Sequence, residues 1–277
     1  MGVHNFNDIS RILSTALNKQ GSFPAQIIKM SGAALSYLFK NRSFYLQSRM
    51  HIDERSPWNK DEFVQHIIKN YGGFFLPDDT TDRKINFPYP WDSVRRDMLV
   101  LLMKGLLAEN VEGDFAELGV YRGGTAKLFH YYAPERKLHL FDTFSGFDGA
   151  DLKLESKETG YHTNVDLSKT GIEAVRQYIN PLNNNVVFHQ GFFPDSIPDN
   201  LQDRKFAFVH LDADLLGPTQ SGLEFFYPRM PRGGVIVVHD YNGWPGARKA
   251  VKDFLHDKLE QELPYPDKSG SAVIKKI

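Results

Sequence analysis

The chain of 277 residues contains no cysteine. Disulfide bonds, thiolate zinc sites and cysteine nucleophiles are therefore excluded. Proteins of the reducing cytoplasm rarely use disulfides, so we expect a cytoplasmic location. With 41% hydrophobic and 24% charged residues, the chain has the composition of a globular protein that can bury a large core without disulfides.

The chain also lacks an excess of charge and a long apolar run. Its 33 Lys and Arg residues face 34 Asp and Glu residues, which gives a net charge of −1 and argues against a nucleic-acid partner. A membrane span needs roughly 20 apolar residues, and the mildly apolar stretch 23–40 is broken by Pro24, Lys29 and Gly32. We therefore expect no membrane span. A helix packed on the protein is preferred over a peripheral amphipathic helix for this stretch.

The pattern of apolar residues divides the chain near Asn86. Helix-like spacing at 6–17 and 63–71 predicts a helical N-terminal extension over residues 1–85. Over residues 86–277 short apolar segments alternate with helical ones, which predicts an α/β fold with a mostly parallel sheet and helices on both faces. Ligands of such sheets bind at the carboxyl ends of the strands. The expected strands are residues 115–118, 137–141, 185–189, 206–211, 234–238 and 272–277, and the expected helices are residues 90–107, 125–132, 168–179, 219–227 and 246–259.

A glycine-rich turn follows the first expected strand. The acidic Glu117 precedes Gly119, Gly123 and Gly124, and a helix begins at Thr125. Glycines let a ligand approach the backbone closely, and the helix N-terminus offers free N–H groups. The spacing is not the G-x-G-x-x-G of dinucleotide folds. With Glu117 it suits a ligand that has an ammonium group and no pyrophosphate, and a plain strand-to-helix turn is the alternative.

Asp142 ends the second expected strand. An acid at that position can accept hydrogen bonds from both hydroxyls of a ribose, and a helix N-cap is the alternative role. The glycine-rich turn and Asp142, in this order and at this separation, favour a nucleoside site.

Acidic residues also follow two later strands. Asp212 and Asp214 come after the strand at 206–211, and His239 and Asp240 come after the next one. Asp212 and Asp240 could bind a divalent cation through oxygen, with His239 as a third ligand although imidazole suits softer metals than Mg²⁺. Alternatively these groups cap helices and bond backbone amides. His239 and Asp240 can point the same way only if the strand ends between them.

Together these motifs resemble the macrocin O-methyltransferase (TylF/MycF/NovP-like) family of class I S-adenosylmethionine-dependent methyltransferases, which have a Rossmann-like fold. The resemblance runs from about Phe87 to Phe254. The matching stretches are residues 113–124, 141–147, 191–197, 210–214, 223–229, 233–241 and 247–254.

The resemblance implies that the domain at 86–277 transfers a methyl group from S-adenosylmethionine to a hydroxyl of a small molecule, a sugar or another natural-product or polysaccharide acceptor. It implies a homodimer, a cofactor lid that starts near Tyr89 and Trp91, and an adenine pocket at Gly191 and Phe192. The expected cofactor-binding residues are Tyr89, Glu117, Leu118, Gly119, Val120, Tyr121, Gly123, Gly124, Thr125, Asp142, Thr143, Ser145, Gly191, Phe192, Phe193 and Asp212.

The same resemblance implies a divalent metal ion, usually Mg²⁺, at Asp212, His239 and Asp240. This sequence has His239 where an acid is usual, so another divalent ion, or none, is the alternative. We expect Asp212 to be the catalytic base and a ligand. His239 and His210 are the rival bases, and for His210 we prefer the role of a buried core histidine.

Two other functions compete with this one. A nicotinamide-dependent oxidoreductase is disfavoured because G-x-G-x-x-G and Tyr-x-x-x-Lys are both missing. A non-catalytic or metal-independent S-adenosylmethionine-binding protein is disfavoured by the acids at the strand ends, although His239 leaves it open. Residues 1–90 and 148–167 are expected to determine the acceptor.

Overall fold

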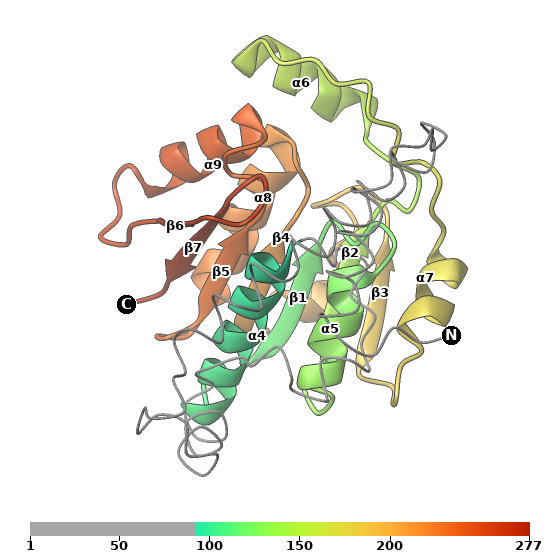
Figure 1. The fold of residues 1–277 in the computed structure, drawn as a ribbon, viewed down its shortest axis with the longest axis vertical. Helices are drawn as coiled ribbons and strands as arrows, with labels where there is room; N and C mark the ends of the chain where they lie inside the picture. The colour runs from blue at the N-terminus through green and yellow to red at the C-terminus, as the bar shows by residue number, and fades with distance from the viewer. Residues whose placement is uncertain (1–91) are drawn as a thin grey trace, which may run out of the picture. The chain divides into compact units, whose positions relative to one another are not determined.

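The computed structural model describes residues 92–277. Figure 1 shows them as helices packed around one sheet. The expected extension over 1–85, its helices at 6–17 and 63–71, the stretch 23–40 and Tyr89 lie outside the described residues. Among residues 92–277, no helix has the length and apolar character that crossing a membrane requires.

The sheet has seven strands in the order β3-β2-β1-β4-β5-β7-β6. Strands β1 to β5 are parallel, whereas β7 runs antiparallel to both β5 and β6. This confirms the predicted mostly parallel sheet. The chain reverses its strand order between β1 and β4, and ligands of such sheets bind in the crevice at this point. The strands are β1 (Asp114–Leu118), β2 (Leu138–Asp142), β3 (Val186–Gln190), β4 (Phe206–Leu211), β5 (Val235–Val238), β6 (Leu263–Tyr265) and β7 (Ser271–Lys275).

Apolar side chains on both faces of the sheet form two cores. Phe115 and Phe208 point into a core shared with α4, α5 and α7, whereas Ala116 and Val209 point into one shared with α8 and α9. Neighbouring residues of a strand face opposite sides, so strands buried on both faces are almost wholly apolar. The helices are α4 (Ser93–Ala108), α5 (Gly124–Tyr132), α6 (Gly149–Thr159), α7 (Ile172–Ile179), α8 (Leu216–Phe226) and α9 (Pro245–Leu255), with short 3₁₀ turns at η3 (Asp199–Leu201) and η4 (Tyr227–Arg229).

Helix α6 lies in the segment 148–167, for which the sequence predicted only a connection. Its composition is mostly polar, so it carries little apolar periodicity. A tertiary contact holds it instead: the buried side chain of Glu155 accepts hydrogen bonds from the backbone N–H of Leu216 (2.8 Å) and of Gly246 (2.9 Å). Glu155 thereby caps the first turns of both α8 and α9.

Several predicted boundaries are wrong by a few residues. Helix α7 begins at Ile172 and not at Ser168, because Asp166 accepts hydrogen bonds from the backbone N–H and hydroxyl of Ser168 and forms a local turn there. The structure begins α8 at Leu216 instead of residue 219 and ends α9 at Leu255 instead of residue 259. The edge strand β6 was not predicted.

Candidate active site

The glycine-rich turn after β1 packs directly on the end of β4. Gly119 has a φ of +87°, and a Cβ there would lie 2.1 Å from the carbonyl oxygen of Asp212. The backbone N–H of Asp212 in turn donates to the carbonyl of Leu118 (2.8 Å). A residue with a side chain would push these two strand ends apart. The glycine therefore sets the distance between the turn and Asp212.

Asp142 holds the same turn from the other side. Its Oδ2 accepts hydrogen bonds from the backbone N–H groups of Val120 (2.7 Å) and Tyr121 (2.8 Å), and its Oδ1 accepts from Phe144 (2.7 Å). The alternative role of helix N-cap is not found, since no helix begins there. An ionised carboxylate has about four acceptor positions, so contact with a ribose stays a prediction for Asp142.

Two cavities open at the carboxyl ends of the strands. One, of about 660 Å³, lies beside the ends of β2 and β3 and is called the β2–β3 cavity here. The other, of about 920 Å³, lies beside the ends of β4 and β5 and is called the β4–β5 cavity. Both cavities are lined by Gly119, Tyr121, Leu167, Asp212 and Asp214, so they adjoin one another.

Most of the expected cofactor residues line these cavities. Glu117, Gly123 and Ser145 line neither cavity. The residues in the β2–β3 cavity are Leu118, Asp142, Thr143, Gly191, Phe192 and Phe193; those in the β4–β5 cavity are Val120, Gly124 and Thr125; and Gly119, Tyr121 and Asp212 line both.

Glu117 lies beneath the glycine-rich turn with its side chain fully buried. Its Oε1 accepts hydrogen bonds from the hydroxyl of Thr125 and from Nδ1 of His210 (2.9 Å). Burial raises the pKa of Glu117 well above its ordinary value, although the hydrogen bond from Thr125 opposes the shift. Its Oε2 is buried and has no hydrogen-bond partner among residues 92–277.

His210 is the buried core histidine that the sequence favoured. Its side chain is fully buried, stacks edge-on against Phe129, and lines neither cavity. Burial lowers the pKa of His210 to about 3, so the ring is neutral at physiological pH. Its bond to Glu117 makes it part of the support for the turn.

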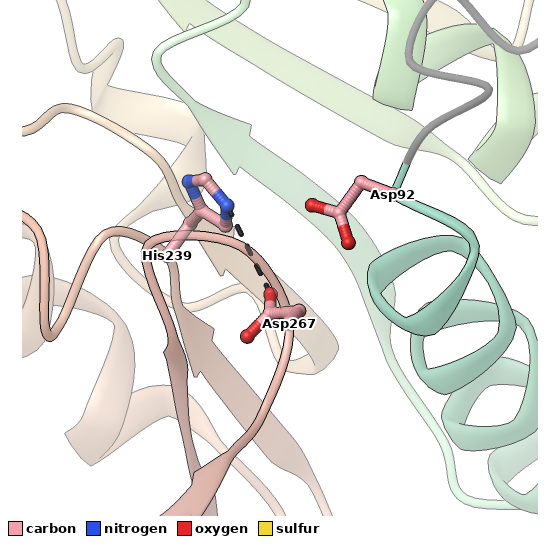
Figure 2. A group of neighbouring side chains, drawn as sticks. All are labelled: Asp92, His239 and Asp267. Atoms are coloured by element: carbon pink, nitrogen blue, oxygen red, sulfur yellow. Dashed lines mark ion pairs between the residues drawn. The ribbon is translucent and has the colours of Figure 1, made fainter. Parts of the chain in front are cut away.

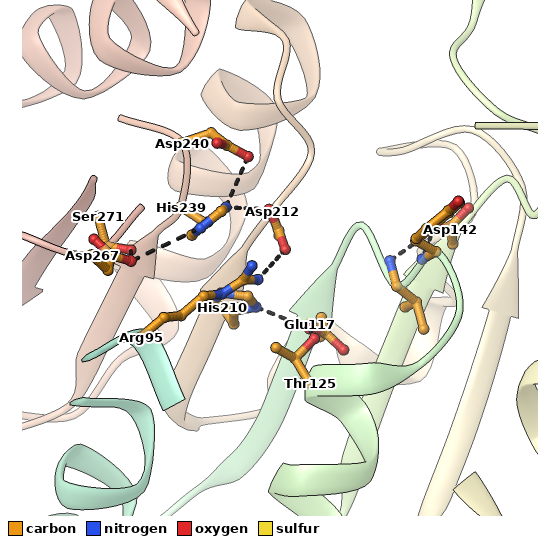
Figure 3. A network of polar contacts seen from close by, with 12 residues as sticks. Arg95, Glu117, Thr125, Asp142, His210, Asp212, His239, Asp240, Asp267 and Ser271 are labelled. Carbon is orange, nitrogen blue, oxygen red and sulfur yellow. Dashed lines mark hydrogen bonds and ion pairs between the residues drawn. The ribbon is translucent and has the colours of Figure 1, made fainter. Parts of the chain in front are cut away.

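Asp212 lies at the centre of the polar network drawn in Figure 3. One carboxylate oxygen pairs with the guanidinium of Arg95, and the other lies 2.9 Å from Nδ1 of His239. The same Nδ1 lies 2.8 Å from Oδ2 of Asp240. The acids and the histidine at the ends of β4 and β5 are thus brought together as the sequence predicted.

The two cations determine the ionisation of this network. Burial alone would raise the pKa of Asp212, but Arg95 and His239 outweigh it and hold that pKa well below its usual range. Burial would likewise lower the pKa of His239, but Asp212 and the hydrogen bonds to both carboxylates raise it to about 10. At neutral pH an anionic Asp212 therefore faces a cationic His239.

The backbone explains why the consecutive side chains of His239 and Asp240 contact each other. Strand β5 ends at Val238, and Asp240 has a φ of +57°. The strict alternation of a strand no longer applies after Val238. The strand thus ends before His239 and not between His239 and Asp240, one residue earlier than the sequence condition required, and neither side chain is bound by the alternation.

Three buried residues near this network were missed by the sequence analysis: Asp92, Arg95 and Asp267. Arg95 lies one turn before Met98 and Leu99, within the apolar stripe of α4. A charged residue at that position is a signal that could have been noticed. Asp267 lies in the β6–β7 connection and carries no pattern that distinguishes it from an ordinary turn residue.

Solved structures share this arrangement of sheet and helices. The solved O-methyltransferase NovP matches 66% of this chain and 79% of its own, with 25% identity and a TM-score of 0.58. The calicheamicin methyltransferase CalS11 matches 79% of this chain and 93% of its own, with 20% identity and a TM-score of 0.56. These likenesses confirm the Rossmann-like class I methyltransferase fold.

Sequence comparison gives relatives with named activities. A Streptomyces olivaceus protein, 8-demethyl-8-(2,3-dimethoxy-alpha-L-rhamnosyl)-tetracenomycin-C 4'-O-methyltransferase, is 32% identical over 173 residues. The match covers 59% of this chain and 64% of that relative, just under two thirds of its length. The mycinamicin III 3''-O-methyltransferase of Micromonospora griseorubida is 30% identical over 61% of this chain and 70% of its own.

The model of one family covers well over half of the chain. It is the macrocin-O-methyltransferase (TylF) model, and it matches residues 93–273. This stretch holds every described strand except the last residues of β7, together with Asp142, Asp212 and His239. The chain therefore belongs to the macrocin-O-methyltransferase (TylF) family.

Proposed function

We propose that this chain transfers the methyl group of S-adenosylmethionine to a hydroxyl of a small molecule. The observation that carries the proposal is the pair of adjoining cavities, with the anionic Asp212 between them. The β2–β3 cavity is lined by Asp142 and Phe192, which suit a nucleoside, and the β4–β5 cavity is lined by charged groups. Family membership and the names of the relatives support the same reaction.

The residues around the β2–β3 cavity fit the cofactor. Gly119 lines both cavities, and its lack of a side chain lets the turn lie directly against Asp212. The buried Oε2 of Glu117 lacks a partner among residues 92–277. Such an oxygen suits the ammonium group of the methionine part, because an unpaired buried acceptor costs free energy. Glu117 contacts Thr125, which lines the adjoining β4–β5 cavity, so we place the methionine part of the cofactor where the two cavities meet. The apolar Phe192 and Phe193 suit an adenine ring.

For the acceptor we propose a hydroxyl of a sugar. The name of the Streptomyces olivaceus relative describes a rhamnosyl compound and 4'-O-methylation. In this chain the β4–β5 cavity is lined by Asp92, Arg95, Asp212, Asp240 and Lys268. Carboxylates accept and cationic groups donate hydrogen bonds, so such walls suit a ligand with several hydroxyls.

The proposed reaction is a direct displacement. The acceptor oxygen forms a bond to the methyl carbon, the bond from carbon to sulfur breaks, and its electron pair remains on sulfur. Attack in line with the breaking bond requires the acceptor to be held by the enzyme. The sulfonium loses its charge in this step, so a site that excludes water favours it.

Asp212 is the group that we propose to receive the proton of the hydroxyl. Its low pKa makes it a weak base towards a free alcohol. However, the hydroxyl becomes strongly acidic as its oxygen gains the methyl group, so a carboxylate can take the proton late in the step. His239 orients Asp212 through the 2.9 Å contact and balances its charge.

The divalent ion expected at Asp212, His239 and Asp240 stays a prediction, and this donor set fits Mg²⁺ poorly. Both oxygens of Asp212 already contact cationic groups, and His239 offers nitrogen where Mg²⁺ prefers oxygen. No step of the proposed reaction uses a metal at these residues. Adding Mg²⁺ should therefore leave the rate of methyl transfer unchanged.

Binding measurements on the full chain separate this function from its rivals. Isothermal titration with S-adenosylhomocysteine should show one tight site, and titration with NADH should show none. Binding of NADH alone would contradict the proposal and favour an oxidoreductase. Binding of S-adenosylhomocysteine without transfer to any sugar hydroxyl would favour a non-catalytic cofactor-binding protein. The homodimer and the cytoplasmic location stay predictions.

A further inference from the structure

The second ring nitrogen of His239 has no role in the network around Asp212. Nδ1 contacts Asp212 and Asp240, whereas Nε2 is buried and has no hydrogen-bond partner among residues 92–277. Figure 2 shows this side of the ring turned towards Asp267 and Asp92. Nε2 lies 3.9 Å from Oδ2 of Asp267, which is too far for a hydrogen bond.

Two buried carboxylates face this nitrogen. The Asp267 side chain is fully buried, and its Oδ2 accepts a hydrogen bond from Ser271 (2.6 Å) while its Oδ1 has no hydrogen-bond partner among residues 92–277. Asp92 is 5% exposed and caps α4 through the backbone N–H of Arg95. One donor atom from each of Asp92, His239 and Asp267 lies within 4.8 Å of the others.

We propose that Asp92, Nε2 of His239 and Asp267 bind a divalent first-row transition metal ion, for which Zn²⁺ is the best match. Zn²⁺ accepts both imidazole nitrogen and carboxylate oxygen as ligands, and its affinity for mixed N/O sites is high among the first-row divalent ions. The ligand atom is Nε2 of His239, whereas Nδ1 is the atom that faces Asp212 and Asp240. Zn²⁺ would displace the proton that Nε2 carries when His239 is cationic, while Nδ1 keeps its proton. It does not depend on the proposed methyl transfer.

The surroundings of His239 match those of a metal-binding histidine. Such a histidine almost always donates its other N–H to a carboxylate, a backbone carbonyl or water, which orients the ring and strengthens the ligand. Here Nδ1 has two carboxylate neighbours, Asp212 at 2.9 Å and Asp240 at 2.8 Å. With bonds of about 2.1 Å at tetrahedral angles, two ligands of Zn²⁺ lie about 3.4 Å apart. The 3.9 Å between Nε2 and Asp267 is close to that separation.

The position of the site gives the ion access to solvent. Asp92 and His239 line the β4–β5 cavity, whereas Asp267 lies behind that wall and lines neither cavity. Three protein ligands leave at least one coordination position of Zn²⁺ for water or another oxygen. The open position would face the cavity in which we place the acceptor.

The test is titration of Zn²⁺ into the full chain after removal of metals by chelation. We expect one site with a Kd below about 1 µM, a loss of affinity of at least about 100-fold in Asp267→Asn, and a comparable loss in Asp92→Asn. Asparagine is as good an N-cap as aspartate, so Asp92→Asn keeps α4 capped and serves as the second variant if Asp267→Asn fails to fold. The matched control is Asp114→Asn, because Asp114 also contacts a histidine, His139 (3.1 Å), at the far end of β1.

A second measurement places the ion. Anomalous scattering at the zinc edge from crystals grown with Zn²⁺ should show one peak between Nε2 of His239 and Asp267. A peak between Asp212 and Asp240 would overturn the proposal. Unchanged Zn²⁺ affinity in both Asp267→Asn and Asp92→Asn, or no binding by the unmodified chain at 100 µM Zn²⁺, would overturn it as well.

Discussion

Arg95, in the first turn of α4, and Asp212, at the end of β4, form an ion pair across 117 residues of sequence. The Arg95 side chain is 7% exposed and that of Asp212 is 19% exposed, so water screens the pair only partly. The pair fixes the carboxylate at the boundary of the two cavities. It also couples the start of α4 to the proposed site of methyl transfer.

Replacing Arg95 by methionine tests this coupling. The variant keeps an unbranched side chain in the apolar stripe but leaves Asp212 with His239 as its one remaining cationic neighbour among the contacts described. We expect the turnover number to fall at least tenfold and the free energy of unfolding to fall by about 2 kcal/mol. Steady-state kinetics and urea unfolding measure the two effects. Arg96→Met is the matched control, because Arg96 pairs with the adjacent Asp97 and lines neither cavity. Equal losses in both variants would contradict the proposed coupling.

Glu155→Ala should destabilise the fold strongly. The backbone N–H groups of Leu216 and Gly246 would both lose their buried acceptor. The expected loss in the free energy of unfolding is about 3 kcal/mol, because each unsatisfied buried donor costs roughly 1–3 kcal/mol. Glu155→Gln keeps one acceptor oxygen and should lose about half as much. Denaturant unfolding that shows no difference between the alanine and glutamine variants would exclude the double cap.

The close approach of Glu155 to α9 gives an independent check. A Cβ on Gly246 would lie 1.9 Å from Oε2 of Glu155, so Gly246→Ala should displace that carboxylate. We expect the double variant Glu155→Ala/Gly246→Ala to lose less free energy of unfolding than the sum of the losses in the two single variants. Additive losses would indicate that the two residues act separately.

Asp151, on α6, predicts a dependence of stability on pH. Burial, with a contribution from Asp148, raises the pKa of Asp151 from 3.8 to about 6. The Asp151 carboxyl therefore stays protonated to a higher pH in the folded state than in the unfolded state. The contribution of this protonated carboxyl to the free energy of unfolding is complete below pH 4 and is lost as the pH rises through 6.

Asp151→Asn removes this loss. At pH 8 the variant should be more stable than the unmodified chain by on the order of 2 kcal/mol, and at pH 4 the difference should vanish. Unfolding in urea at both pH values measures the difference in the free energy of unfolding between the two proteins. Asp195→Asn, at an exposed carboxylate, is the control and should show no such difference. A gain that is the same at pH 4 and pH 8 would count against the shifted pKa.

The sequence predicted those features that depend on neighbouring residues. Strands buried on both faces are largely apolar runs. The residue at the end of such a strand, such as Asp142, or just after it, such as Asp212, then lies at the edge where ligands bind. Features held by a distant partner could not be predicted in this way. Helix α6 depends on the contacts of Glu155 with α8 and α9, and Arg95 and Asp267 gain their significance from partners on other strands and loops.

The most direct test of the account is the rate of methyl transfer by Asp212→Asn. Methyl-deuterated S-adenosylmethionine and a panel of rhamnosides and other glycosides are incubated with the full chain, and the methylated product is followed by mass spectrometry. We expect the unmodified chain to label a sugar hydroxyl. Asp212→Asn should transfer at least about 100-fold more slowly, while isothermal titration shows S-adenosylhomocysteine binding within about threefold. Full activity in Asp212→Asn would contradict the role of Asp212, and with it the proposed chemistry of the site.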